Sequence, residues 1–330
     1  MKKIFALLLA LFLFTANFIG CAEDTPELKD PNNEENQPPV QDNENPASDF
    51  RYEENHQGGI TITSFIGDDT NIIIPEKIEG KDVTHIGSNA FRGRDNMISV
   101  TLPDTVIEIG TAAFAECDSL TTVVLSKSLT TITNYAFEKN PLLTSIVLPS
   151  SLTSVGSYIF QDCISLKQIN IPKSLTDWHS HAFSYCSLET VTFEEGLETI
   201  GFSAFSVTKI KHVTLPNSLI KLEPYAFSGC VELETVELNE GLTTIDGLAF
   251  HANTKLQEII IPASVTNLTD LAFSECSALK KLMFEGNAPD GFKSEDELLP
   301  VKDVNFTVYY HENAIGFTTH EWCGYPTKIW

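Results

Sequence analysis

The segment Ala113–Tyr135 reads AFAECDSLTTVVLSKSLTTITNY, and it decides the fold because the chain repeats it. The pattern starts again at Ala136-Phe137 and extends in both directions with spacings of 22 or 23 residues. The nine repeated phenylalanines are Phe91, Phe114, Phe137, Phe160, Phe183, Phe205, Phe227, Phe250 and Phe273. Nine aligned copies predict a solenoid in which each repeat forms one coil and stacks on the next.

Each repeat contains a short alternating segment and a second apolar edge. Val123 and Leu125 alternate with more polar positions, which is the period of a half-buried strand. Proline ends this strand in several repeats, as Pro149 does, since proline cannot donate to a ladder. We therefore expect stacked coils with a parallel β-sheet on the concave face. Short turns or helical turns, which direct Ala and Phe inward, are expected on the other side.

The repeats are flanked by segments that break the period. Residues 91–285 hold the repeats, 51–90 are expected to form an irregular first coil, and 286–330 a C-terminal cap. Both flanks contain strand-like runs, such as residues 71–75 and 308–310. Caps at both ends would cover the exposed strand edges, which otherwise template aggregation.

The repeat pattern Ala-Phe-x-x-Cys-x-x-Leu-x-x-Val-x-Leu-Pro-x-x-Leu-x-x-Ile-Gly resembles the BspA-type (Treponema pallidum-type) leucine-rich repeat. The match covers residues 51–330 and implies a leucine-rich repeat solenoid. Members of this family are commonly secreted or lipid-anchored surface proteins, and some are adhesins for host or bacterial proteins. The resemblance implies the same role here, which the repeat by itself does not show.

The N-terminus has the features of an export signal. Lys2 and Lys3 precede an apolar run that continues to Ile19, so residues 1–20 are expected to be a signal peptide. The sequence Phe18-Ile19-Gly20-Cys21 resembles a bacterial lipobox, which implies lipid attachment at Cys21. The alternative is ordinary cleavage nearby, with Cys21 as a bystander.

Residues 21–50 are expected to be a lipidated cysteine followed by a disordered tether. Residues 22–49 contain nine Asp or Glu, one Lys and five prolines, a composition that cannot form a core. The run Ala22-Glu23-Asp24 resembles the acidic export signal of some Bacteroidota lipoproteins. This resemblance implies a protein anchored to the outer membrane by lipid and facing the cell exterior.

The charge of the chain argues against nucleic acid as a partner. It has 45 Asp and Glu against 21 Lys and Arg, a net charge of -24, whereas phosphate binding needs clustered cations. His179 and His181 have no suitable neighbours for a zinc site, and no catalytic motif is present. We expect no enzyme activity, no metal and no cofactor.

Most cysteines share one column, three residues after the repeat phenylalanine: Cys117, Cys163, Cys186, Cys230 and Cys276. Their spacing is that of the repeat and not that of metal ligands. Asn140, Thr208 and Asn253 occupy the same column, so the position should favour a small side chain that bonds to backbone. We expect buried free thiols. A disulfide between Cys163 and Cys186 is the less favoured alternative.

The outward positions of the concave strands form the first candidate binding surface. They are Thr122, Ser145, Gln168, Asn170, Thr190, Thr192, His212, Thr214, Thr235 and Glu237. The strip is hydroxyl-rich and mostly uncharged, which suits a recognition face for an extended partner. The alternative is that Thr and Ser simply suit exposed strands.

A second strip lies two residues before the repeat phenylalanine. It contains Tyr135, Tyr158, His181 and Tyr225, with Ser203 between the last two. Stacked aromatic side chains can anchor a protein or a sugar, but they can equally pack against the next coil.

These observations support three hypotheses. The first is a lipid-anchored surface protein, an adhesin that binds an extracellular protein of the host or of other bacteria. The second is a glycan-capture lipoprotein of a nutrient-uptake system, and the third is a periplasmic scaffold.

Overall fold

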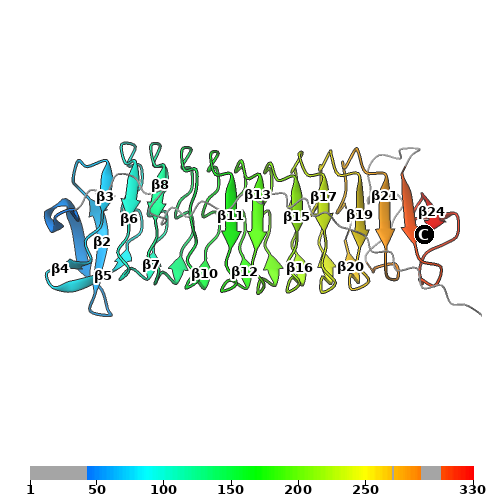
Figure 1. Cartoon of the computed structure of the whole chain (residues 1–330), viewed down its shortest axis with the longest axis horizontal. Coiled ribbons are helices and arrows are strands. Elements are labelled where there is room, and N and C mark those ends of the chain that lie inside the picture. The colour runs from blue at the N-terminus through cyan, green and yellow to red at the C-terminus, as the bar shows by residue number, and fades with distance from the viewer. Residues whose placement is uncertain (1–42, 270, 291–305) are drawn as a thin grey trace, which may run out of the picture.

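The computed structural model describes residues 43–269, 271–290 and 306–330. It confirms the predicted solenoid: Figure 1 shows the coils stacked side by side along one long axis, in chain order from one end to the other. The predicted signal peptide, Cys21 and most of the tether lie outside the described residues. Within the described part, no helix is long and apolar enough to span a bilayer.

Each coil has three sides, which we name here. The strand face is the side that was predicted to be concave. The stack in Figure 1 is nearly straight. The strand face consists of β3 (Asn71–Ile73), β6 (Ser99–Thr101), β8 (Thr122–Val124), β11 (Gln168–Ile171), β13 (Thr190–Phe193), β15 (His212–Thr214), β17 (Thr235–Glu237), β19 (Glu258–Ile261) and β21 (Lys281–Phe284). The turn edge is the side that carries the repeat phenylalanines.

The third side, which we name the rear side, carries short strands. Its ladders continue over more coils without a break than those of the strand face do. Its members are β5 (Lys81–Ile86), β7 (Glu108–Ile109), β9 (Thr131–Ile132), β10 (Ser154–Val155), β12 (Asp177–Trp178), β14 (Thr199–Ile200), β16 (Lys221–Leu222), β18 (Thr244–Ile245) and β20 (Asn267–Leu268). Strands β12 to β20 form one parallel sheet, and β5 to β10 belong to another. The strand face is instead divided, because no ladder joins β8 to β11, β13 to β15 or β17 to β19 among the described residues.

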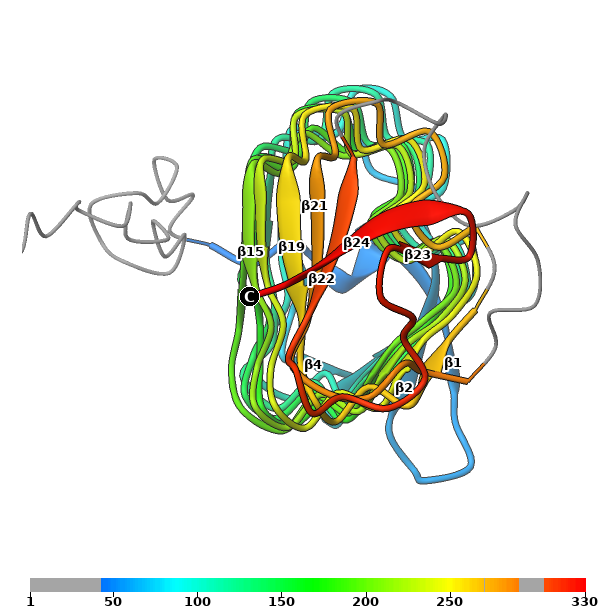
Figure 2. The same ribbon diagram turned by 90° about the vertical axis from the view of Figure 1, so that its right-hand side faces the viewer.

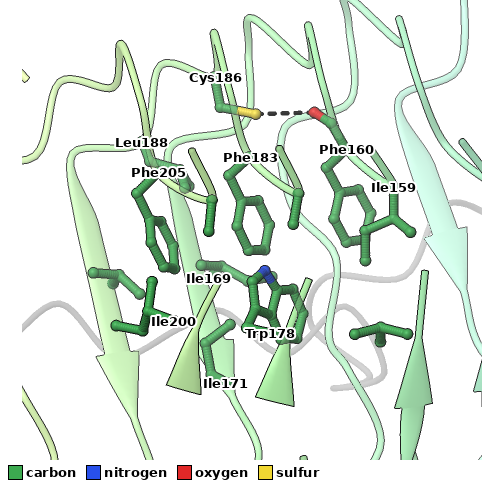
Figure 3. Close-up of a cluster of buried hydrophobic side chains, with 14 of the residues drawn as sticks. Ile159, Phe160, Ile169, Ile171, Trp178, Phe183, Cys186, Leu188, Ile200 and Phe205 are labelled. Atoms are coloured by element: carbon green, nitrogen blue, oxygen red, sulfur yellow. Dashed lines mark hydrogen bonds between the residues drawn. The ribbon is translucent and has the colours of Figure 1, made fainter. Parts of the chain in front are cut away.

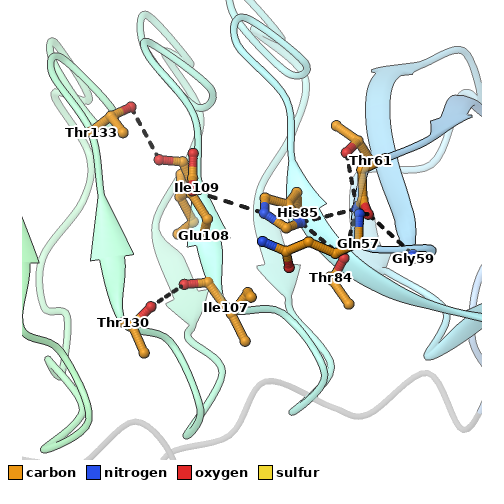
Figure 4. A network of polar contacts seen from close by, with 11 residues as sticks. Gln57, Gly59, Thr61, Thr84, His85, Ile107, Glu108, Ile109, Thr130 and Thr133 are labelled. Atoms are coloured by element: carbon orange, nitrogen blue, oxygen red, sulfur yellow. Dashed lines mark hydrogen bonds and ion pairs between the residues drawn. The ribbon is translucent and has the colours of Figure 1, made fainter.

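Threonines on the rear side reinforce the stacking, as Figure 4 shows. The hydroxyl of Thr130 donates to the carbonyl of Ile107 at 3.0 Å, and that of Thr133 donates to Ile109 at 3.2 Å. Each bond joins one coil to the coil before it. Outward hydroxyls in this fold therefore have a structural use that requires no ligand.

The turn edge consists of turns, so the first of the two predicted forms is confirmed, and helical turns are not formed in its described residues. The residues two before and two after the phenylalanine have positive φ, as at Tyr135 (60°) and Lys139 (55°). The N–H groups of Tyr135, Phe137 and Lys139 donate to carbonyls of the next coil at 3.0, 2.9 and 2.8 Å. Left-handed backbone costs roughly 1–2 kcal/mol per residue, and the three bonds per coil offset that cost. The described helical residues are only those of the 3-10 turn η1 (Ala47–Asp49).

The core is a column of stacked aromatic rings. Phe114 and Phe137 lie 5.4 Å apart between centroids and are fully buried, and the same arrangement recurs along the stack. Figure 3 shows how Trp178 is accommodated in a position that is aliphatic in the other repeats. Its indole lies parallel to the ring of Phe183, at 5.2 Å and 4°. Truncating one such buried ring typically costs about 3–5 kcal/mol.

The cysteine column bonds to backbone, as predicted. The Cys186 thiol donates to the carbonyl of Phe160 at 3.0 Å (Figure 3), and Cys163 donates to Phe137 at 3.2 Å. The five column cysteines are buried and not disulfide-bonded. Burial raises the pKa of the Cys163 thiol to about 12. These thiols are structural hydrogen-bond donors and poor nucleophiles.

The N-terminal cap begins earlier than the predicted boundary at residue 51. Asn45 is buried, and its side-chain oxygen accepts the N–H of Ile73 at 2.8 Å. β1 (Phe50–Glu54) then pairs antiparallel with β2 (Ile60–Phe65), which lies parallel to β5, while β4 (Lys77–Ile78) pairs with the start of β5. The Asn55 amide donates to Thr84 at 2.9 Å, and Figure 4 shows Thr84 beside His85 at this end. Residues 43–50 therefore belong to the cap and not to the tether.

The C-terminal cap continues the strand face and then crosses it. β22 (Thr307–Tyr310) pairs parallel with β21, β24 (Tyr325–Ile329) pairs with β22, and β23 (Glu321–Trp322) turns back on β24. Viewed along the stack in Figure 2, β24 lies across the open end of the last coil. The ring of Phe317 packs between Tyr310 and Trp322, at 4.9 and 5.0 Å. This aromatic cluster closes the core.

Candidate functional site: two exposed surfaces of the solenoid

The structure places the ten predicted strand-face residues on one side of the stack. Thr190, Thr192, His212, Thr214, Thr235 and Glu237 are exposed, while Thr122, Ser145, Gln168 and Asn170 are half-buried. All lie on strands except Ser145, which makes a single bridge to Thr122. The sequence prediction of which side chains point outward is therefore correct.

Many of these side chains bond to one another across neighbouring coils. The hydroxyl of Thr192 donates to Asn170 at 2.7 Å, and that of Thr214 donates to Glu237 at 3.0 Å. Nδ1 of His212 and the hydroxyl of Thr235 lie 2.8 Å apart. These bonds occupy hydrogen-bonding groups that a ligand would need, and they favour a structural role for the strip.

The aromatic strip forms a continuous stack on the turn edge. Tyr135 and Tyr158 lie 4.9 Å apart, and Tyr158 and His181 lie 4.7 Å apart, with nearly parallel rings. The next position does not follow the sequence alignment: Ser203 is buried, and the neighbouring Phe202 fills the gap. Its ring lies 5.3 Å from His181 and 5.3 Å from Tyr225.

The stacking decides what this strip can bind. The faces of Tyr158 and His181 are covered by neighbouring rings, so their edges are what a partner can reach. A sugar that stacks on an aromatic ring needs an open face. Burial between the rings lowers the pKa of His181, and its Nδ1 lies 3.2 Å from the Ser184 hydroxyl. The strip is suited to apolar contact rather than to glycan stacking.

A second row of exposed apolar side chains follows the repeat phenylalanine in the same coils, and it was not predicted from the sequence. It comprises Leu142, Ile164, Tyr185, Val207 and Val231, which follow the repeat phenylalanine by two to five residues. Their exposed fractions lie between 45 and 56%. The five residues stand at different distances from the phenylalanine, so they form no column in the aligned repeats and only their exposure in the structure brings them together.

The two rows together define an apolar patch on the turn edge. The patch consists of Tyr135, Tyr158, His181, Phe202 and Tyr225 in the first row and Leu142, Ile164, Tyr185, Val207 and Val231 in the second. Both rows occupy the same five coils. In the coils beyond them the position two before the phenylalanine is not aromatic, and it is apolar at Ala112, Leu248 and Leu271. Exposed apolar surface that gathers on one side of a protein is the usual mark of an interaction site.

The described residues contain no group of three or more His, Cys, Asp or Glu side chains that could hold a metal ion. His179 is exposed and His181 lies within the aromatic stack, so the two do not form the start of such a group. The chemistry that the described surface offers is recognition through apolar and polar contacts.

Comparison with known families identifies the repeat. The family model for the BspA type leucine-rich repeat region matches six copies, over residues 84–208 and 178–290. The chain belongs to this family. Its solenoid, buried phenylalanine column and cysteine column are thus features of a BspA-type leucine-rich repeat protein.

Solved structures with the same fold include a leucine-rich repeat protein from Bacteroides ovatus. It is 26% identical with a TM-score of 0.63, covering 80% of this chain and 78% of that protein. A T. pallidum leucine-rich repeat protein is also 26% identical, with a TM-score of 0.49, covering 72% of this chain and 91% of its own. The pneumococcal vaccine antigen PcpA is 22% identical with a TM-score of 0.46, and the match covers 79% of this chain and 71% of that protein. A search of curated proteins finds no match.

Membership of the family gives a coarse function. The BspA-type leucine-rich repeat suggests a role in binding other proteins, and members of the family are typically not enzymes. The comparisons add no partner, so the choice of binding surface depends on the geometry of this chain.

Proposed function

We propose that this protein is a lipid-anchored adhesin, which is displayed on the bacterial surface and binds a protein partner through the apolar patch. The observation that carries the proposal is that five consecutive coils expose two apolar rows on a chain with a net charge of -24. Water penalises exposed apolar surface, and aromatic side chains are enriched at the centres of protein interfaces.

The size of the patch supports a protein partner. Adjacent coils in a parallel β stack lie ~4.8 Å apart, so five coils extend about 20 Å along the stack. The central residues of a standard protein interface cover a comparable span. The partner would contact Ile164 and Tyr185 at the centre, with Tyr135 and Val231 near the two ends.

Lipid attachment at Cys21 would hold the solenoid at the membrane, with residues 22–42 as the spacer. The acidic Ala22-Glu23-Asp24 run supports export to the outer face of the outer membrane. Many copies anchored on one cell would add avidity to a weak single contact.

The binding test uses a panel of purified host matrix, plasma and bacterial surface proteins against the purified protein. The patch variant combines Leu142→Ser, Ile164→Ser and Val207→Ser, which are exposed positions that should leave the fold intact. The matched control combines Gln168→Ala, Asn170→Ala, Thr190→Ala and His212→Ala on the strand face. We expect the patch variant to lose at least about tenfold in affinity, while the control binds as the unmodified protein does.

The opposite result, with loss of binding only in the control, would assign the partner to the strand face. Binding to polysaccharide but to no protein of the panel would favour the glycan-capture hypothesis, in which Tyr135, Tyr158 or Tyr225 would be needed.

The location is tested by protease treatment of intact cells followed by immunoblotting of the repeat region. Digestion without lysis is the expected result. Protection until the outer membrane is opened would reject an adhesin and leave a periplasmic scaffold. A Cys21→Ser variant is expected to lose its membrane attachment, which separates anchoring from binding.

A further inference from the structure

A groove on the strand face lies apart from the apolar patch, near the C-terminal end of the stack. It is formed by β17, β19 and β21 and has a volume of about 310 Å³. Its apolar lining includes Leu238, Ile260 and Met283. Ile260 is 42% exposed although it is a large aliphatic residue on a strand of a strongly acidic protein.

The groove lies where the sheet is divided. β15 pairs with β17 and β19 pairs with β21, but no ladder joins β17 to β19 among the described residues. The facing edges of these two strands therefore lack the ladder bonds that join β15 to β17 and β19 to β21. A bound polypeptide can use such unpaired edges.

Carboxylates surround the apolar floor. Glu237, Glu240, Glu258 and Glu285 all line the groove. Glu237 accepts a hydrogen bond from Thr214 at 3.0 Å, and Glu258 pairs with Lys281 at 2.8 Å. In the described parts of the chain, Glu240 and Glu285 have no cation within ion-pair distance.

Glu240 and Glu285 line the same groove. Desolvation, followed by the charge of Glu285 and a hydrogen bond to it, raises the pKa of Glu240, which is an exposed residue. Two carboxylates in this arrangement are stabilised by a cation that lies between them.

The lining favours an organic cation over a metal ion. No three acidic, histidine or cysteine side chains of the described chain converge as metal ligands, and hard cations prefer a shell of oxygen atoms to an aliphatic floor. An arginine side chain matches both parts of the groove. Its methylene stem packs on apolar surface, and its planar guanidinium donates to two carboxylates at once.

We propose that the groove between β17, β19 and β21 binds an arginine side chain presented by an extended segment of a protein partner. The guanidinium would lie between Glu240 and Glu285, and the stem would lie on Ile260 and Met283. This site is separate from the apolar patch and goes beyond the proposed function.

Methionine methyl groups provide a direct test. The sequence contains three methionines, of which Met283 lines the groove and Met97 is buried elsewhere. The purified protein, labelled with ¹³C at its methionine methyl groups, is titrated with the peptide acetyl-Thr-Thr-Arg-Thr-Thr-amide. The expected result is a saturable shift of the Met283 signal without movement of Met97. The same peptide with citrulline, which lacks the charge, should bind at least about tenfold more weakly.

A double variant, Glu240→Gln with Glu285→Gln, should lose the shift. Glu189→Gln, which removes an exposed carboxylate on another coil, should keep it. Equal shifts with the arginine and citrulline peptides, or no saturable Met283 shift with either, would overturn the proposal. So would a saturable shift with calcium chloride alone. The patch variant leaves the groove intact. If this variant no longer binds the protein partner but still shows the Met283 shift with the arginine peptide, failure of one site can be told apart from failure of the other.

Discussion

The turn edge and the strand face are two sides of the same coils, yet they are built in different ways. On the turn edge, each of Tyr135, Phe137 and Lys139 donates its N–H to the next coil, and the same three bonds recur along the stack. On the strand face, the ladder is interrupted three times in the described region. The side that the sequence marks as turns therefore holds the coils together more continuously than the side it marks as sheet. Substitutions on the strand face should therefore cost less stability than substitutions of buried groups on the turn edge.

The largest contrast is expected in thiol reactivity. Cys117 on the turn edge is fully buried, and burial raises its pKa to about 12, so at neutral pH it should react at least about a thousandfold more slowly than an exposed thiol. A cysteine introduced on the strand face by Thr190→Cys should react with the maleimide as fast as a cysteine in an unstructured peptide. Labelling with a maleimide followed by mass spectrometry of the peptides measures both. Rapid labelling of Cys117 in the folded protein would contradict the comparison.

Asn140 should be the most costly polar residue of the turn edge to replace. It is fully buried, its amide donates to the carbonyls of Phe114 and Phe137 at 2.9 and 2.8 Å, and its oxygen accepts the N–H of Cys117 at 3.0 Å. Asn140→Leu leaves the Phe114 carbonyl and the Cys117 N–H without this partner, and the Phe137 carbonyl keeps only the Cys163 thiol, so we expect a loss of about 3 kcal/mol in the free energy of unfolding.

The matched change on the strand face is Asn170→Leu, at a half-buried position. Its expected effect is within about 0.5 kcal/mol. Urea unfolding followed by tryptophan fluorescence compares the two variants. Equal losses would mean that the strand face contributes as much to stability as the turn edge does.

Substitution by glycine should have opposite effects on stability at the turn edge and on the strand face. Lys139 has a φ of 55°, and glycine occupies the equivalent position at Gly93 and Gly229. Lys139→Gly relieves the left-handed strain and is expected to be neutral or stabilising by up to about 1 kcal/mol. Thr122→Gly in β8 should destabilise by about 1 kcal/mol, since glycine weakens a strand. Thermal unfolding by circular dichroism is the measurement, and a lower midpoint for both variants would refute the assignment of strain.

The smallest effect is expected from pH. Burial lowers the pKa of His181 below its ordinary value of 6.5, so near that pH the unfolded chain binds more protons than the folded one. The contribution of this histidine is therefore fully present above pH 6.5 and is lost as the pH falls below it. His181→Phe should reduce the loss of stability between about pH 7 and pH 5, whereas His212→Phe on the strand face serves as the control. The same pH dependence in both variants would exclude His181 as its source.

The sequence predicts the repeat, its inward columns and the role of the cysteine column, because each is a residue type recurring at a fixed spacing. It does not predict the backbone of the turn edge. Tyr135 and Lys139 give no sign of left-handed conformation, which depends on bonds to the next coil. Phe202 was missed because it stands one position outside the aromatic column, where a strict alignment reads Ser203. Asn45 was assigned to the tether by composition, although its contacts place it in the cap.

The repeated bonds of the turn edge have an electrical consequence. Every one of them runs from an N–H of the earlier coil to a carbonyl of the later coil. Peptide dipoles of about 3.5 D then add along the turn edge, as they do in a helix, but with the positive end at the C-terminal coil. The two ends require opposite capping chemistry. The N-terminal cap must supply donors, as the N–H of Phe65 does for the carbonyl of Ala90, and the C-terminal cap must supply acceptors. The turn edge is therefore polar from one end to the other, and its two caps cannot be exchanged.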